Sequence, residues 1–434
     1  KGERKATTNK IKVTTTRSNT QFNVTVDNLW STWKPTSYTN PDAGLSFQAM
    51  GTTLVNDGKN DTYTNCAVNV TVNLAVKGDN RLNRLHCATH DGQNENYRSD
   101  KNHTNIINIT GDSDATLTLA NIAVNKNESY TNAFIGGTDR LDHSFRITLD
   151  KITVYAGGGR LDFGTAIGGG GNGPGRVTIN GGRITAVNSS TGTAIGGGCG
   201  TSGPGGYGEV TINGGSVYAY NYKPHYTSEN STTYTDAIPT AIGGGSSGTQ
   251  IGGTGIVNIT GGYIYAYSEV GNAIGGGGGG NGKTNDSNKY YNTFGGTADV
   301  AISGNATVEA VSGTSCAIGG GPGGGRHYKK YADDNGGKLP NATVGSGDMN
   351  VPANGDGGTA KLTISGNPTI RSGSIGGGSP LDQNRVYGAT VGAAVVNISG
   401  GTTHGQIVMD GKIKNVPAEI TGLTNGEDSS FTMS

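Results

Sequence analysis

The ten residues 177–186 read VTINGGRITA, and this phrase recurs along the chain. Its other copies, close or degenerate, begin at Leu117, Ile147, Val210, Val257, Val300, Leu362 and Val396. A second phrase, AIGGG, begins at Ala166, Ala194, Ala241, Ala273 and Ala317, with looser versions at Phe134 and Ser374. Successive copies of the first phrase begin 30 to 34 residues apart, except for three intervals of 47, 43 and 62 residues. A unit of about 30 residues therefore repeats eight times, and three units are enlarged.

Within the first phrase, apolar and polar residues alternate. Val177 and Ile179 share one side of an extended chain, and Thr178 and Asn180 share the other. This period of two is typical of a β-strand, and no segment of the repeat has a convincing helical period. The glycine pair that follows suits a bend, because glycine adopts backbone conformations that are closed to other residues. Each unit is therefore predicted to consist of short strands joined by glycine turns.

One such unit cannot bury its apolar side alone, but stacked units place identical side chains above one another. The sequence therefore predicts an all-β protein: a single-stranded right-handed parallel β-helix of about eight to ten rungs. A β-sandwich or a propeller would demand antiparallel strands with hairpin signals, which the repeat does not show.

The ends of the chain depart from the repeat, as the caps of a solenoid must. Residues 1–110 are predicted to form an N-terminal cap and irregular first rungs, and residues 111–404 the repeat β-helix. Residues 405–434 are predicted to form a C-terminal cap or to lead towards a further domain. Bulged loops are expected in the enlarged units, at residues 221–240, 281–294 and 326–356.

Composition excludes several classes of protein. Lys and Arg together number 32, as do Asp and Glu, so the chain lacks the basic excess of a nucleic-acid-binding protein. No apolar run reaches the 18 or so residues of a membrane helix, and no membrane insertion is expected. Four cysteines without Cys/His spacing argue against a structural metal centre. No cofactor is predicted, although Asp333 and Asp334 suit a weak Ca²⁺ contact as well as a solvated turn.

The two phrases resemble the Gly-rich β-helix repeats of secreted and surface-anchored proteins of Gram-positive gut bacteria. The resemblance covers roughly residues 110–404. Proteins with such repeats are often described as carbohydrate-binding or adhesin-like, so the resemblance implies an extracellular or cell-surface location. It assigns no catalytic residue, because the repeated positions are those that build the rungs.

Aligning the rungs brings tyrosines together on one outward side. The column of Thr185 contains Tyr155, Tyr218, Tyr265, Glu309 and Arg371 on other rungs. The tyrosines predicted to bind a ligand are Tyr218, Tyr220, Tyr263, Tyr265 and Tyr267. Aromatic rings with a polar tip suit the apolar faces of sugars. The alternative is that tyrosine, a favoured strand residue, stabilises a sheet face with no ligand at all.

The bulged loops are expected to cluster on one side of the solenoid, where such loops commonly form a binding face. They add Tyr290, His327 and Tyr328 to the predicted ligand-binding residues. The preferred hypothesis is an extracellular bacterial module that binds a glycan or polysaccharide, or mediates adhesion, through these tyrosines and loops.

An enzyme on the same face is the first alternative. Glycoside hydrolysis needs two carboxyl groups across the scissile bond, and Glu309, Asp333, Asp334 and Asp236 are the candidates for such a pair. A polysaccharide lyase would instead use a base such as His327. The second alternative is a structural stalk or filament subunit, which would self-associate.

Overall fold

The computed structural model describes the greater part of the chain. The described residues are 6–32, 43–49, 53–56, 61–64, 67, 69–89, 105–120, 133–137, 145–157, 163–189, 191–200, 203–222, 237–280, 291–324, 338, 341–344, 347–352, 355–378, 392–404, 406–409, 424–425 and 430–433. Every regular element in these ranges is a β-strand, which confirms the predicted all-β class.

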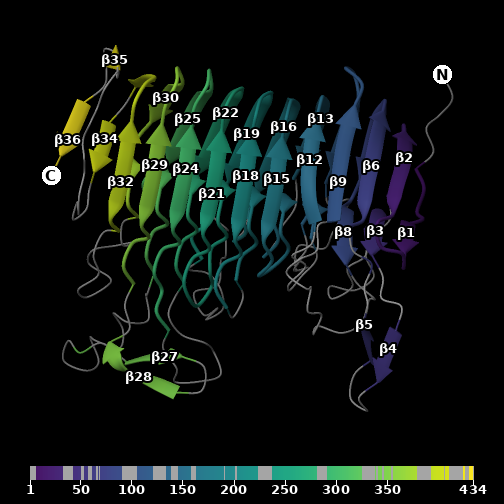
Figure 1. The fold of residues 1–434 in the computed structure, drawn as a ribbon, viewed down its shortest axis with the longest axis horizontal. Coiled ribbons are helices and arrows are strands. Elements are labelled where there is room, and N and C mark those ends of the chain that lie inside the picture. Colours follow the sequence, from purple (N-terminus) through teal and green to yellow (C-terminus); the bar gives the residue numbers. More distant parts are fainter. Residues whose placement is uncertain are drawn as a thin grey trace.

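Three parallel sheets of ten strands each run along the molecule, and between residues 45 and 404 each turn of the chain adds one strand to each sheet in the same order (Figure 1). The first sheet contains β1 (Ile11–Thr15), β3 (Leu45–Ala49), β8 (Leu85–Thr89), β11 (Ile135–Gly136), β14 (Ile167–Gly168), β17 (Ile195–Gly196), β20 (Ile242–Gly243), β23 (Ile274–Gly275), β26 (Ile318–Gly319) and β31 (Ile375–Gly376). This arrangement is the predicted parallel β-helix, in which one rung is one turn of the chain.

The second sheet follows the first within each rung. It contains β2 (Gln21–Asp27), β6 (Thr71–Lys77), β9 (Asn105–Gly111), β12 (Phe145–Asp150), β15 (Gly175–Ile179), β18 (Gly208–Ile212), β21 (Gly255–Ile259), β24 (Ala298–Ile302), β29 (Ala360–Ile364) and β32 (Ala394–Ile398). The third sheet completes the rung. It contains β7 (Asp79–Leu82), β10 (Thr116–Leu119), β13 (Ile152–Ala156), β16 (Gly182–Asn188), β19 (Ser216–Asn221), β22 (Tyr263–Ser268), β25 (Thr307–Ser312), β30 (Thr369–Ser372), β33 (Thr402–His404) and β35 (Thr424–Asn425).

Three further strand pairs lie outside these sheets. Two are antiparallel hairpins, β4 (Thr53–Asn56) with β5 (Asp61–Thr64) and β27 (Asn341–Val344) with β28 (Gly347–Pro352), and both lie below the stacked strands in Figure 1. The second hairpin falls within the predicted bulged loop 326–356. The third pair, β34 (Gln406–Met409) with β36 (Ser430–Met433), is parallel and lies near the C-terminus.

Apolar residues of successive rungs pair directly and form the core. Val177 pairs with Val210, and Val210 pairs with Val257 on the next rung. On the third sheet Val217 pairs with Ile264, and both side chains are fully buried. Burying such a side chain stabilises the fold by about 1.5–3 kcal/mol relative to leaving it exposed. The repeated phrase thus builds continuous apolar columns along the solenoid axis.

Between the first and second sheets, the chain turns through a segment built mainly from glycine, which we call the glycine corner. It comprises, in the six rungs from β14 to β31, the residues that link the Ile-Gly strand to the next second-sheet strand. Their amides and carbonyls form a continuous series of hydrogen bonds of 2.7–2.9 Å. Each glycine in the series donates to the one before it, in the order Gly173, Gly198, Gly206, Gly245, Gly253, Gly277, Gly296, Gly321, Gly358, Gly378 and Gly392. Backbone packs here directly on backbone, and a Cβ added to Gly245 would lie 2.0 Å from the carbonyl oxygen of Gly198.

Buried polar side chains hold the turn between the third sheet and the next first-sheet strand. The side-chain amide of Asn188 donates to the carbonyl oxygens of Gly164 at 2.9 Å and Thr193 at 3.0 Å. One rung later Asn221 occupies the paired position and donates to the carbonyl oxygens of Gly192 and Thr240. These contacts satisfy backbone carbonyls that have left the sheet ladders, which explains why a polar side chain is tolerated in the interior.

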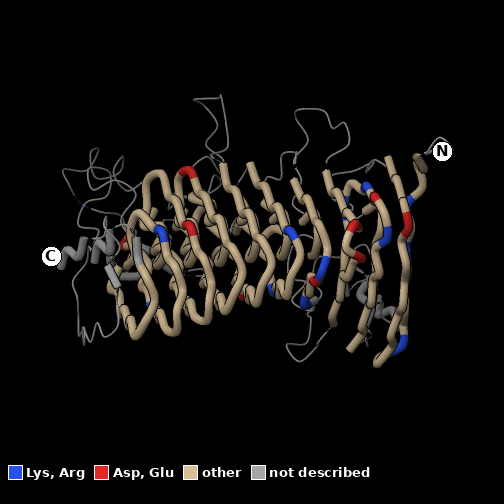
Figure 2. The backbone as a smooth tube through the Cα atoms, turned by 90° about the horizontal axis from the view of Figure 1, so that it is seen from above, with Lys and Arg blue, Asp and Glu red and all other residues tan. Residues whose placement is uncertain are grey.

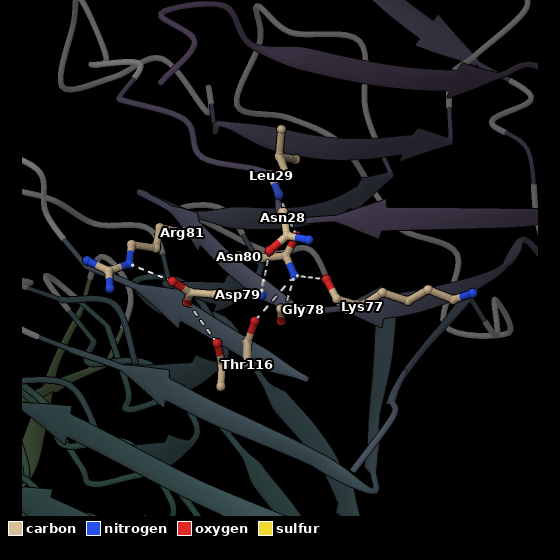
Figure 3. A network of polar contacts seen from close by, with 8 residues as sticks. All are labelled: Asn28, Leu29, Lys77, Gly78, Asp79, Asn80, Arg81 and Thr116. Carbon is tan, nitrogen blue, oxygen red and sulfur yellow. Dashed lines mark hydrogen bonds and ion pairs between the residues drawn. The ribbon is translucent and has the colours of Figure 1, made fainter. Parts of the chain in front are cut away.

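The rungs that precede the repeat are joined by a comparable buried amide (Figure 3). Asn80 pairs with Leu117 of the next rung, and its side chain is fully buried. Its Oδ1 accepts a hydrogen bond of 2.8 Å from the amide of Leu29, and its Nδ2 donates to the carbonyl oxygen of Lys77 at 2.8 Å. All three sheets begin within residues 1–110, the segment for which the sequence predicts a cap and irregular rungs.

Candidate ligand-binding face

The predicted alignment of outward residues on the third sheet is confirmed by the strand register. Tyr155 pairs with Thr185, Thr185 with Tyr218, and Tyr218 with Tyr265. The column continues through Glu309 to Arg371. The outward residues of β19 and β22 are half-buried and alternate with fully buried ones, so the tyrosines stand on the outer surface of the solenoid.

Six tyrosines on two adjacent rungs form two parallel rows, which we call the tyrosine face. The first row is Tyr218, Tyr220 and Tyr222, and the second is Tyr263, Tyr265 and Tyr267. Each ring of the first row contacts one ring of the second, with centroids 5.6–5.8 Å apart and planes tilted by 44–55°. Tilted contacts of this kind are favoured by the ring quadrupole and fix the ring orientations before any ligand binds.

Tyr222 belongs to this face, although the sequence prediction did not include it. Its ring is parallel to that of Tyr220 within 3°, at a centroid distance of 6.1 Å, and 40% of the residue is exposed. The alternation of Tyr218, Tyr220 and Tyr222 in the sequence indicates that all three point outward. Tyr222 follows the last residue of β19, however, and so lay outside the aligned repeat.

Two phenol groups of the first row have pKa values above the ordinary value of tyrosine. Partial burial, followed by the neighbouring Tyr265, raises the pKa of Tyr220. Burial and then Tyr267 raise the pKa of Tyr222. At neutral pH these hydroxyls therefore both donate and accept hydrogen bonds, which is the capacity needed to meet sugar hydroxyls.

Glu309 stands at the edge of the tyrosine face, as the sequence predicted, but it is engaged with its neighbours. Its Oε1 lies 3.2 Å from Nη1 of Arg371 on the next rung. Burial raises the pKa of Tyr263, and the charge of Glu309 and a hydrogen bond to it raise that pKa further. A carboxylate that is already paired on two sides suits a positioning role for Tyr263 better than the role of a nucleophile.

The remaining predicted site residues lie outside the described ranges. Among the catalytic candidates these are Asp236, Asp333 and Asp334, and among the ligand-binding candidates Tyr290, His327 and Tyr328. The described residues contain no group of three or more His, Cys, Asp or Glu that would hold a metal ion. The described part of the chain also contains no helix long and apolar enough to cross a membrane.

Charged residues are sparse along the middle of the solenoid and more numerous towards its N-terminal end (Figure 2). Several of them pair across rungs of the second sheet, where Glu209 lies 3.3 Å from Arg176 and Lys361 lies 3.2 Å from Asp299. Surface pairs of this kind contribute about 0–1 kcal/mol each.

The fold and this face define a parallel β-solenoid with a preorganised aromatic surface. No family model, curated protein or solved structure matches the chain.

Proposed function

We propose that the protein is an extracellular or cell-surface module of bacterial origin that binds glycans through the tyrosine face. The observation that carries the proposal is the pair of three-ring rows, because their rings are oriented by one another and half-exposed to solvent. Tyrosine also loses little conformational entropy on binding, since it has only two side-chain torsions. The resemblance to Gly-rich repeats of adhesin-like surface proteins supports the same function.

The direction of the rows indicates how a polymer would lie. Alternate residues of a strand are about 6–7 Å apart, so three rings of one row span about 13 Å along the strand. A chain of sugar units that follows the strand therefore meets three rings, whereas a chain that follows the solenoid axis meets two. The first row ends at Tyr222, at the start of the predicted loop 221–240.

A glycan array probed with the labelled protein tests this function. We expect selective binding, and we expect Tyr265→Ala to weaken it about tenfold or more because Tyr265 lies at the centre of its row. Tyr207→Ala is the matched control, since Tyr207 precedes the second-sheet strand β18 and packs 5.9 Å from the guanidinium of Arg176. Equal binding by both variants and the unmodified protein would overturn the proposal, as would the absence of binding to any glycan on the array.

A further inference from the structure

The surface is lower beside the second row of the tyrosine face. Tyr267 pairs with Val311 of β25, and Val311 is 41% exposed. Gly373 lies one strand further along, because it follows Ser372, the partner of Ala310. The outward residue therefore shortens from tyrosine to valine to glycine over three successive rungs. We call this lower area the shelf, and it consists of Val311, Gly373 and their outward neighbours Glu309 and Arg371.

The space above the shelf is open. A Cβ built on Gly373 would meet no other atom within 4 Å. The ring of Tyr267 contacts that of Tyr222, 5.7 Å away, and no guanidinium of the described residues stacks on it. Neighbouring strands are about 4.8 Å apart, so the rungs of β25 and β30 give a floor about as wide as one sugar ring. Tyr267 and the shelf are therefore open to the same ligand.

Glu309 and Arg371 place polar groups along one side of this floor. Oε1 of Glu309 lies 3.2 Å from Nη1 of Arg371, and Tyr263 donates a hydrogen bond to the same carboxylate. A carboxylate accepts about four hydrogen bonds, and a guanidinium has more N–H donors than this one contact uses. The pair therefore offers an acceptor and a donor side by side. Two adjacent sugar hydroxyls match this combination, because each hydroxyl both donates and accepts.

The charges around the shelf favour a neutral ligand. Glu269 lies two residues beyond Tyr267, and its charge acts on the phenol of Tyr222. Two carboxylates, Glu309 and Glu269, thus stand near the guanidinium of Arg371, and the described groups here carry a net charge of −1. An acidic sugar meets this excess of negative charge, whereas the hydroxyls of a neutral sugar donate to the carboxylates.

We propose that Tyr267 and the shelf bind one neutral sugar unit that carries adjacent free hydroxyl groups. The proposal rests on the function proposed above and names the class of glycan. The ring of Tyr267 and the side chain of Val311 contact the apolar C–H groups of the sugar, and its hydroxyls pair with Glu309 and Arg371. Glu309 is then a specificity-determining residue at the edge of the tyrosine face, in addition to its hydrogen bond with Tyr263.

Pairs of oligosaccharides that differ only in charge test the proposal. Cellohexaose and mannohexaose are each titrated beside the same hexamer with its C6 carbons oxidised to carboxylates, which keeps the rings and the linkages. We expect the neutral member of at least one pair to bind about tenfold or more tightly than the acid. Added salt should narrow the difference, because it screens the carboxylates. Equal or tighter binding of the acid in both pairs would overturn the proposal, and so would the absence of binding in both.

A matched pair of charge variants tests the role of Glu309. Glu309→Gln should weaken binding of the neutral hexamer about tenfold and narrow its difference from the acid. The control is Asp299→Asn, because Asp299 lies 3.2 Å from Lys361 across the same two rungs on the second sheet. It breaks an ion pair of the same kind and should leave both affinities unchanged. Equal affinities of the two variants would overturn the proposal.

Filling the shelf gives a second test, which does not depend on charge. Gly373→Leu places a side chain in the open space above the floor, so the variant should fold, which chemical denaturation checks, but bind about tenfold or more weakly. Gly373→Ala adds one methyl group and should weaken binding much less. Unchanged binding by Gly373→Leu would overturn the proposal.

The array separates this proposal from the glycan function itself. Binding that is kept in Gly373→Leu and Glu309→Gln but lost in Tyr265→Ala would leave the glycan function standing and exclude the sugar unit on the shelf. The absence of binding to any glycan would overturn both proposals.

Discussion

The glycine corner and the tyrosine face are parts of the same rungs, yet opposite physical rules apply to them. At the glycine corner the backbones of successive rungs touch, so that a single added methyl group collides with a carbonyl oxygen. On the tyrosine face the side chains point away from the core, and its columns hold Thr, Tyr, Glu and Arg at equivalent positions. The glycine corner therefore determines whether successive rungs can stack. The residues of the tyrosine face can differ from rung to rung and so can acquire a binding function.

Adding a methyl group at the glycine corner should have the largest effect. Gly245→Ala would place its Cβ 2.0 Å from the carbonyl oxygen of Gly198, an atom that cannot move without breaking the series of backbone hydrogen bonds. We expect a loss of about 3 kcal/mol or more in unfolding free energy, measured by chemical denaturation. Gly373→Ala is the control, because nothing lies within 4 Å of its added Cβ, and it should be neutral or slightly stabilising. Equal stability of the two variants would contradict the distinction between the regions.

The thiol of Cys316, buried beside the first-sheet strands β26 and β31, should be almost unreactive. Burial raises the pKa of Cys316 to about 12, and backbone hydrogen bonding at Gly376 and Ile318 offsets only part of this shift. Because the raised pKa favours the neutral thiol, the thiolate fraction at pH 8 is about a thousandfold below that of a thiol with the ordinary pKa of 9.0. Site-resolved alkylation followed by mass spectrometry should show modification of Cys316 only after denaturation. Rapid modification of this residue in the folded protein would show that the stack of first-sheet strands opens readily.

The buried amide of Asn221, at the end of the first tyrosine row, holds the turn from the third sheet to the first, and its loss should have an intermediate effect. Asn221→Ala removes the donor to the carbonyl oxygens of Gly192 and Thr240, which then remain buried without that partner. We expect a loss of about 1–3 kcal/mol in unfolding free energy. The control Asn213→Ala removes an exposed amide that contacts Asn180 at 2.8 Å, and it should cost about 0.5 kcal/mol. A larger loss for Asn213→Ala would contradict the importance of burial at this turn.

Truncation on the tyrosine face should have the smallest effect on stability. Tyr265→Ala removes the tilted contact with Tyr220, a pair interaction of about 0.5–1.5 kcal/mol. Tyr265→Phe keeps the ring and should leave the unfolding free energy almost unchanged, which separates ring packing from the hydroxyl group. A loss as large as that of Gly245→Ala would mean that the tyrosines are structural, and it would remove the main reason to assign them to a ligand.

The fold and the composition of the tyrosine columns were predictable because both follow from the repeat. Apolar side chains at every second residue must lie in the interior, so the copies of the phrase can stack in only one register. The column from Tyr155 to Arg371 followed from that register, and strand pairing confirms it. The positions of the loop residues could not be predicted in this way, because the loops lie outside the repeat and their residues have no equivalent on other rungs.

The sequence by itself determined which residues are interior, which are outward and which rungs carry the tyrosines, because those properties depend only on a period of two and on stacking. The tertiary structure decided which rotamers the outward side chains adopt and which neighbours they contact. The tilt of Tyr220 against Tyr265, the position of Arg183 over Tyr218 and the pairing of Glu309 with Arg371 all join neighbouring rungs. Each of these contacts depends on the rotamer of a long side chain beside another long side chain, and no alternation of residues along one strand encodes that choice.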